Sequence, residues 1–222
     1  MDSKQTYDDK YASNYGVKYP EGHIIRFYEH LLKHEYAISG ASQEKLLDFG
    51  CGNGTHTAYF AEKGFDVMGL DIIQSAIDSA RQRFSNLESS FRTMNLGQDV
   101  SELVDDAFDV ILCNQVLYYM SDSDLNRTVK QLESCLKPGG LIYITMMSSH
   151  NHYWNYASPL ENGLHEVALS GRLDETSYIN FMRSEDHVLS TFDVFECEFL
   201  GYYDISIREG SSHHYQFLGR KK

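Results

Sequence analysis

Short apolar runs alternate with stretches of helical apolar spacing over the middle of the chain. Five runs are short, apolar and bounded by glycine or polar residues, which predicts strands at residues 44–50, 65–71, 89–95, 108–114 and 141–147. Helical spacing predicts helices at residues 55–64, 72–84 and 125–136. This alternation indicates a doubly wound α/β fold with a parallel sheet, whose ligands bind at the carboxyl ends of the strands.

The two ends of the chain carry other patterns. Residues 23–34, HIIRFYEHLLKH, have the spacing of an amphipathic helix. Residues 198–207 and 211–219 predict two strands of a hairpin joined through REGSS. LKPGG at residues 136–140 predicts a turn, because proline fixes φ and paired glycines permit a reversal. Residues 148–183 are rich in histidine and aromatic residues, and their pattern assigns no element.

Composition narrows the possible partners. The 222 residues suit one domain, and 42% hydrophobic with 23% charged residues is typical of a globular chain. The net charge of −13 argues against a nucleic acid or an anionic membrane, since both need a basic surface. We see no signal peptide and no window apolar enough to span a bilayer. The four cysteines form no CxxC pair, which fits a reducing cytoplasm and argues against a disulfide framework.

The stretch LLDFGCGNGTH, residues 46–56, predicts a strand, a bare turn and the start of a helix. Gly50, Gly52 and Gly54 have no Cβ, so they can adopt positive φ and let a ligand approach the backbone. The helix that follows aims unpaired N–H groups at the same place, which suits a phosphate or a carboxylate. On these residues alone, dinucleotides and carboxylate-bearing nucleosides are both candidate ligands.

Four motifs follow one another in register: the glycine turn, Asp71 at the end of the next strand, FDVILCNQVLYYM at 108–120 and LKPGGLIYITM at 136–146. Together they resemble the class I S-adenosylmethionine-dependent methyltransferase family, and most closely its branch that acts on small molecules. The resemblance covers roughly residues 44–147. It implies a methyltransferase that moves a methyl group to a small-molecule acceptor by direct in-line displacement.

The resemblance also implies a Rossmann-like seven-stranded sheet, mostly parallel, whose antiparallel C-terminal hairpin supplies the reversed last strand of that fold. We expect one domain made of four parts. These are an N-terminal helical lid at 1–40, a cofactor-binding core at 41–147, an acceptor-side insertion at 148–190 and terminal strands at 191–222.

S-adenosylmethionine is the cofactor that the resemblance implies. Asp48 and the turn from Gly50 to Gly54 would hold its methionine part, with the ammonium near the acid. Asp71 stands 17 residues after Gly54 and would accept hydrogen bonds from both ribose hydroxyls.

The remaining cofactor contacts follow the third and fourth predicted strands. Asn95 and Leu96 stand where the family contacts adenine, although the family more often has Asp at the first of these positions. Asn114, Gln115 and Val116 would line the site of the reactive sulfonium. The expected cofactor-binding residues are Tyr19, Arg26, Asp48, Gly50, Cys51, Gly52, Asn53, His56, Asp71, Ile72, Asn95, Leu96, Asn114, Gln115 and Val116.

The tyrosines of the N-terminal stretch are spaced by four residues. This spacing is typical of a helix stripe, and the alternative is a lid over the cofactor with Arg26 as a carboxylate partner. The four are Tyr7, Tyr11, Tyr15 and Tyr19.

Acceptor-side chemistry has fewer signals. Tyr119 follows the fourth strand, where many relatives carry His, and His150 and His152 follow the fifth, so we expect these three to be catalytic. A buried structural tyrosine and a solvated loop are the competing readings. The His-x-His spacing has no carboxylate or cysteine partner nearby, so we expect no metal. Further candidates for an acceptor pocket are Tyr153, Trp154, Tyr156, His165 and His214.

Two other functions remain open on the sequence. A nicotinamide-dependent oxidoreductase also uses a glycine turn, but its pattern is GxGxxG, whereas GxGxG followed by Thr55 stands here. Asp48 would also repel a diphosphate and attract an ammonium. A cofactor-binding protein of the same fold without turnover is the second alternative. The sequence leaves open the acceptor, the methylated atom, the need for a general base and the oligomeric state. Asn114 is not followed by the Pro-Pro-aromatic signature of family members that methylate exocyclic or amide nitrogen, which argues against DNA adenine and glutamine side chains as acceptors.

Overall fold

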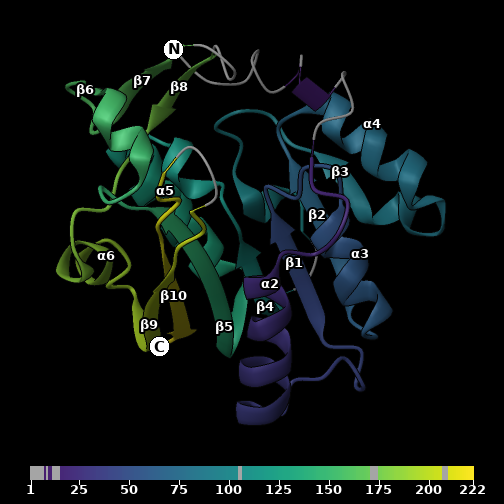
Figure 1. Cartoon of the computed structure of the whole chain (residues 1–222). Helices are drawn as coiled ribbons and strands as arrows, with labels where there is room; N and C mark the ends of the chain where they lie inside the picture. The colour runs from purple at the N-terminus through teal and green to yellow at the C-terminus, as the bar shows by residue number, and fades with distance from the viewer. Residues whose placement is uncertain (1–7, 9, 12–15, 105–106, 171–174, 207–209) are drawn as a thin grey trace.

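The computed structural model describes residues 8, 10–11, 16–104, 107–170, 175–206 and 210–222. Seven strands form one sheet in the order β3-β2-β1-β4-β5-β10-β9 (Figure 1). The strands from β1 to β5 are parallel, and β10 runs antiparallel to both of its neighbours, which confirms the expected fold. Their bounds are β1 Lys45–Phe49, β2 Asp66–Asp71, β3 Phe91–Thr93, β4 Phe108–Cys113, β5 Leu136–Met147, β9 Phe195–Tyr203 and β10 His214–Lys221.

Helices cover both faces of this sheet (Figure 1). On one face the apolar residues of α2, η1 and α3 pack against β1, β4, β5 and β10. On the other face α5 and α6 pack against the same central strands. The helical elements are α2 Gly22–Arg26, η1 Phe27–Glu35, α3 Thr55–Glu62, α4 Gln74–Arg83, η2 Ser85–Ser90, η3 Val100–Glu102, η4 Leu117–Tyr119, α5 Asp122–Ser134, η5 His152–Tyr156 and α6 Glu185–Thr191. The helix predicted at 23–34 is therefore present, although most of it has π-helical bonding.

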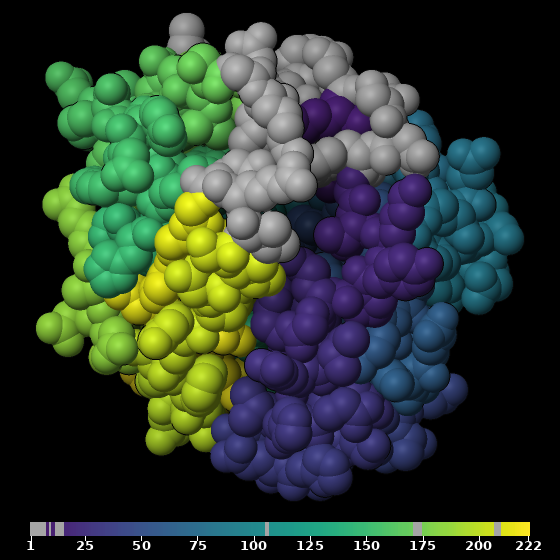
Figure 2. Space-filling view, in the orientation of Figure 1, coloured from purple at the N-terminus to yellow at the C-terminus, as the bar shows by residue number. Residues whose placement is uncertain are grey.

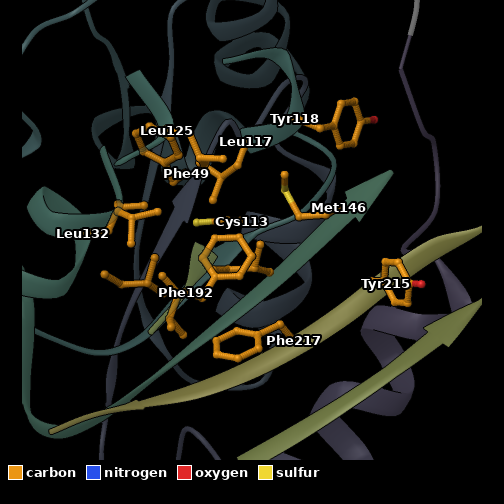
Figure 3. Close-up of a cluster of buried hydrophobic side chains, with 14 of the residues drawn as sticks. Phe49, Cys113, Leu117, Tyr118, Leu125, Leu132, Met146, Phe192, Tyr215 and Phe217 are labelled. Atoms are coloured by element: carbon orange, nitrogen blue, oxygen red, sulfur yellow. The ribbon is translucent and has the colours of Figure 1, made fainter. Parts of the chain in front are cut away.

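Helix α5 shows how local sequence sets an element. Ser121 caps its N-terminus by accepting a hydrogen bond from the backbone N–H of Asp124 (3.2 Å). Leu125, Val129 and Leu132 recur at helical spacing and are buried. Figure 3 shows two of them, Leu125 and Leu132, in the apolar cluster that also holds Cys113 of β4 and Phe217 of β10. This cluster fixes β4 and β5, whose carboxyl ends carry the site.

The predicted reversal of the chain at residues 136–140 is wrong. Leu136 pairs with Phe108 and Leu141 pairs with Val110, so the chain leaves β4 at residues 137–140 and returns to it in the same direction. Gly139 takes the positive φ of 74° that this irregularity needs. Proline and glycine therefore mark a bulge within β5.

Three short antiparallel strands within residues 148–183, to which the sequence pattern assigns no element, form a second sheet. These strands are β6 Ala157–Pro159, β7 His165–Leu169 and β8 Glu175–Ile179. The segment after β8 joins this sheet to the loop that follows β4, because the backbone N–H of Asn180 donates to the carbonyl oxygen of Tyr118 (2.7 Å). The hairpin predicted near the C-terminus is confirmed as β9 and β10.

Candidate functional site

The glycine turn follows β1 directly and lies against the end of β2. The backbone N–H groups of Gly50 and Cys51 both donate to the carbonyl oxygen of Leu70, at 2.7 and 3.0 Å. Gly50, Gly52 and Gly54 have positive φ values of 76°, 53° and 76°. A side chain at these positions would therefore be strained, as the sequence predicts. A Cβ added to Gly50 would also collide with Val116, which follows β4.

Asp71 ends β2 and is buried beneath this turn. Its Oδ2 accepts a hydrogen bond from the backbone N–H of Gly52 (2.8 Å), and its Oδ1 accepts one from the backbone N–H of Ile73 (2.9 Å). Burial raises the pKa of the Asp71 carboxyl, while these backbone N–H groups oppose the shift. The carboxylate is thus held in one orientation, with further lone pairs on both oxygens.

Asp48, the second acid of the site, lies within β1 and is 2% exposed. Thr57 of α3 donates its hydroxyl to Oδ2 of Asp48 (2.6 Å). Burial raises the pKa of Asp48 to about 7, and the Thr57 hydrogen bond only partly offsets this. No cation pairs with Asp48 within the described ranges of the chain. A buried acid without a cation suits a ligand that brings one.

Glu21, which the sequence did not indicate, joins the N-terminal helix to the loop after β4. Its Oε2 accepts a hydrogen bond from Asn114 Nδ2 (2.9 Å), and its Oε1 accepts one from Gln115 Nε2 (3.0 Å). His56 Nε2 lies 3.7 Å from Glu21 Oε2, and burial lowers the pKa of His56 to about 4. Gln115 has a φ of 55°, which is rare for a residue other than glycine, and its backbone N–H donates to Thr145 Oγ1 (2.8 Å).

Three rings stack beside this cluster. His23 of α2 stacks on Tyr203 of β9 at 4.2 Å, and Tyr203 stacks on His214 of β10 at 5.0 Å, both with an interplanar angle of 12°. Gln115 Nε2 also donates to the Tyr203 hydroxyl (3.1 Å). Figure 2 shows the N-terminal helix region, in purple, directly beside the C-terminal strands, in yellow. The two ends of the chain therefore meet at the loop after β4.

The N-terminal segment lies on the glycine turn. Asn53 Nδ2 and Thr55 Oγ1 donate to the carbonyl oxygen of Val17, at 3.0 and 2.6 Å. A Cβ added to Gly52 would collide with the hydroxyl of Tyr11, so that tyrosine touches the turn. Of the four tyrosines of the predicted stripe, Tyr7 and Tyr15 lie outside the described residues.

A surface hollow of about 260 Å³ opens beside this segment. It is smaller than the clefts of 300–1,000 Å³ that hold most small ligands. We therefore do not regard it as the cofactor site. Its lining residues are Gly16, Lys18, Tyr19, Asn53 and Arg83.

Other expected cofactor residues lie at the exposed rim. Asn95 and Leu96 follow β3, and Leu96 is 62% exposed, which leaves an apolar surface open to a flat ring. Ile72 is half-buried after Asp71, and Cys51 is buried in the turn.

Two expected contacts receive no support from their placement. Arg26 is exposed on α2, two residues from the buried Ile24, and residues two apart on a helix point in opposite directions. Tyr19 is 82% exposed. Their role in holding the cofactor stays a prediction.

The expected acceptor-side residues lie at two places. Tyr119, in η4, is half-buried with its ring 4.5 Å from that of Tyr118. His150 is exposed and its ring meets that of His213 edge-on at 5.2 Å, while His152 Nδ1 lies 3.0 Å from the carbonyl oxygen of Ser211. Both histidines therefore pack on the segment that leads into β10, and their catalytic role stays a prediction.

Sequence reasoning missed several polar residues that complete the site. Four of them lie on predicted elements and Glu21 lies just before one, but each is one polar residue among many, and most of their partners come from distant parts of the chain. A Pro-Glu pair just before a helix was the one local signal, because it marks a helix start. The missed residues are Glu21, His23, Thr57, Thr145 and Tyr203.

Two further properties concern the described residues alone. Among them, none of the helices combines the length and the apolar character that a bilayer crossing requires. In the same part of the chain, His, Cys, Asp and Glu side chains form no group of three arranged for a metal ion.

Residues 46–140 match a family of methyltransferase domains. The YqeM protein of Bacillus subtilis (strain 168) is 35% identical over 109 residues, which cover 47% of this chain and 43% of that protein. A ubiquinone biosynthesis O-methyltransferase of Bartonella tribocorum is 32% identical over 117 residues, 51% of this chain and 45% of that protein. The chain thus spans less than half the length of these curated relatives.

Solved structures share the fold of this chain. A SAM-dependent methyltransferase from Methanosarcina mazei has a TM-score of 0.65 at 21% identity, and the match covers 81% of this chain and 92% of that one. The N-methyltransferase NodS of Bradyrhizobium japonicum WM9, solved with S-adenosyl-L-homocysteine, has a TM-score of 0.61 at 15% identity over 100% of this chain and 99% of its own. At these identities the likeness concerns the fold.

Proposed function

Because residues 46–140 match a family of methyltransferase domains and the fold matches S-adenosylmethionine-dependent methyltransferases, we propose that this chain is a class I enzyme of that kind and transfers a methyl group from S-adenosylmethionine to a small-molecule acceptor. The observation that carries the proposal is the buried carboxyl of Asp48, which has no cation among the described residues and lies in the strand that enters the glycine turn. An ammonium-bearing nucleoside would supply that cation, whereas a dinucleotide diphosphate would be repelled.

The chain's own residues fit such a cofactor. Asp48 would hold the ammonium, and the bare turn from Gly50 to Gly54 would let the methionine part lie against the backbone. Backbone N–H groups already fix the orientation of the Asp71 carboxylate, which would accept hydrogen bonds from the ribose hydroxyls. Leu96 would offer its exposed side chain to the adenine ring. The bound cofactor supplies a methyl group activated by positively charged sulfur.

The N-terminal segment would act as a lid. Tyr11 touches Gly52, and Val17 is bonded to Asn53 and Thr55, so this segment lies where a ligand on the glycine turn would be covered. Cofactor entry therefore requires the segment to lift, and its return would exclude water from the site. This supports the lid reading of the tyrosine stretch over a simple helix stripe.

The acceptor would bind at the rim between the loop after β4 and the second sheet. Relatives named ubiquinone biosynthesis O-methyltransferases favour an acceptor with a hydroxyl group. Placement of the acceptor in line with the methyl group would supply much of the rate. Tyr119, His150 and His152 lie on segments that border this rim and stay the proposed acceptor-side residues.

Two measurements test this function. Calorimetry should show S-adenosylhomocysteine binding without comparable NAD binding, and the reverse preference would overturn the proposal. A metabolite panel incubated with methyl-labelled S-adenosylmethionine should then give a labelled product that depends on the protein. An Asp48→Ala variant serves as control, since it should lose both cofactor binding and label transfer.

A further inference from the structure

His214 carries a buried ring nitrogen that no described residue pairs with. Its Nδ1 lies 2.9 Å from the carbonyl oxygen of Ser212, while its Nε2 is buried and has no hydrogen-bond partner. A carbonyl oxygen only accepts hydrogen bonds, so Nδ1 must carry the ring proton. Nε2 of the neutral ring is therefore a hydrogen-bond acceptor that lacks a donor.

The surroundings of His214 keep this ring neutral. The side chain is 4% exposed, and burial lowers its pKa to about 4. The titratable and charged groups around it are Glu21 and His23 at the start of the N-terminal helix, His213 beside it in the chain, Tyr203 of β9 and Tyr118 of η4. A buried acceptor without a donor is unfavourable, and a ligand that donates a hydrogen bond to it would relieve this cost.

His214 stands at the rim where the acceptor would arrive. It begins β10 and pairs with Met147 at the end of β5, whereas Cys113 at the end of β4 pairs with Ile144. Three further residues of strand place His214 about 10 Å beyond the end of β4, at about 3.3 Å per residue. It is linked to the loop after β4 through Tyr203, which accepts a hydrogen bond from Gln115.

Two aromatic rings pack against the ring of His214. Tyr203 stacks on one face of the His214 ring, and the Tyr118 ring is tilted by 48° at 5.8 Å. Figure 3 shows Tyr118 at the end of β5, with its hydroxyl directed away from the apolar cluster. Aromatic neighbours favour a planar apolar ring as the ligand. The lone pair of Nε2 and the nearby carboxylate of Glu21 disfavour an anion.

We propose that Nε2 of His214 accepts a hydrogen bond from the hydroxyl group of an aromatic methyl acceptor. This inference rests on the proposed function and narrows its substrate class. His214 would thereby select acceptors that can donate from the ring edge over isosteric rings that cannot. Entry of such a ring requires one of the two packed rings to shift, and Tyr118 belongs to a short 3₁₀ turn between β4 and α5.

The test uses the full chain saturated with S-adenosylhomocysteine and two probes of similar shape, phenol and toluene. Nitrogen NMR of ¹⁵N-histidine-labelled protein should show His214 as the neutral Nδ1–H tautomer. Phenol should shift the Nε2 signal and bind at least fivefold more tightly than toluene. In His214→Phe this preference should fall below twofold. In the matched control His213→Phe, whose Nδ1 already contacts Ser148 Oγ (2.7 Å), it should persist.

Several outcomes would overturn the inference. An Nε2–H tautomer, an unmoved Nε2 signal or a phenol preference that survives His214→Phe would each remove His214 from acceptor recognition. If His214→Phe does not fold, the tautomer and the phenol shift in the parent protein decide. Failure of S-adenosylhomocysteine to bind the parent would overturn the proposed function itself, whereas binding of that nucleoside without the phenol response would overturn the inference alone.

Discussion

The carboxylate of Asp71 holds the glycine turn in place, because its Oδ2 accepts a hydrogen bond from the backbone N–H of Gly52 (2.8 Å). A residue at the end of β2 thus orients the loop that follows β1, and the two strands are parallel neighbours. The same carboxylate is the expected partner of the cofactor ribose. One side chain would therefore both bind the cofactor and hold the glycine turn in the conformation that receives it.

Substitution of Asp71 should weaken S-adenosylhomocysteine binding. We expect a loss of about 1.5–3 kcal/mol for Asp71→Ala, because charge-assisted hydrogen bonds to the ribose and the support of Gly52 are both lost. Calorimetry measures the affinity, and circular dichroism checks the fold. Asp78→Ala, on the exposed face of α4, is the matched control and should bind within about twofold of the parent. Unchanged affinity in folded Asp71→Ala would remove this residue from the site.

Cofactor binding should depend on pH through Asp48. Its pKa is about 7 in the ligand-free protein, and a bound ammonium would lower that pKa, so binding releases a proton where Asp48 is protonated. Affinity should therefore rise as pH increases, by about tenfold between pH 6 and pH 8. The proton release is measured by calorimetry in buffers of different ionisation enthalpy. Asp48→Asn should bind weakly and without this dependence.

The same shift has a consequence for stability. The pKa of Asp48 is higher in the folded than in the unfolded protein, so its contribution to stability is present below about pH 4 and is lost as pH rises toward about 7. The ligand-free Asp48→Asn variant should therefore have a higher Tm than the parent at pH 8. An equal or lower Tm at pH 8 would show that Asp48 is paired in the free protein.

Glu21 should stabilise the junction between the N-terminal helix and the loop after β4. Glu21→Gln retains one acceptor oxygen for two donors, Asn114 Nδ2 and Gln115 Nε2, so we expect a loss of about 1–3 kcal/mol in the free energy of unfolding. The matched control is Glu29→Gln, which breaks a pair with Lys33 on the helix surface and should cost less than about 0.5 kcal/mol. Urea unfolding compares the two, and equal losses would contradict the role given to Glu21.

Local patterns predicted the central sheet and the glycine turn because these features depend on neighbours in the chain. Strand β4 ends in the continuous apolar run of residues 110–113, and the turn needs residues without Cβ at three alternate positions. Glu21 could not be found in this way, since it lies 93 residues from Asn114 and only the fold brings them together. Strand β7, HEVAL, does show burial at alternate positions, and this period of two was the signal available for the second sheet.

The segment after β5 carries two of the proposed acceptor-side residues. His150 is exposed and His152 is tied to the carbonyl oxygen of Ser211, so both lie beside the entrance to β10 and outside the glycine turn. Replacement of either by Ala should leave S-adenosylmethionine affinity within about threefold, a shift under about 1 kcal/mol. Turnover of the acceptor found in the labelled-cofactor screen should fall at least tenfold. The control is His187→Ala, which removes a half-buried histidine of α6 and should leave both quantities unchanged. If His150→Ala and His152→Ala bind cofactor and methylate as well as the parent, this segment is scaffold. The acceptor would then be held by Tyr119 and by the rings that surround His214.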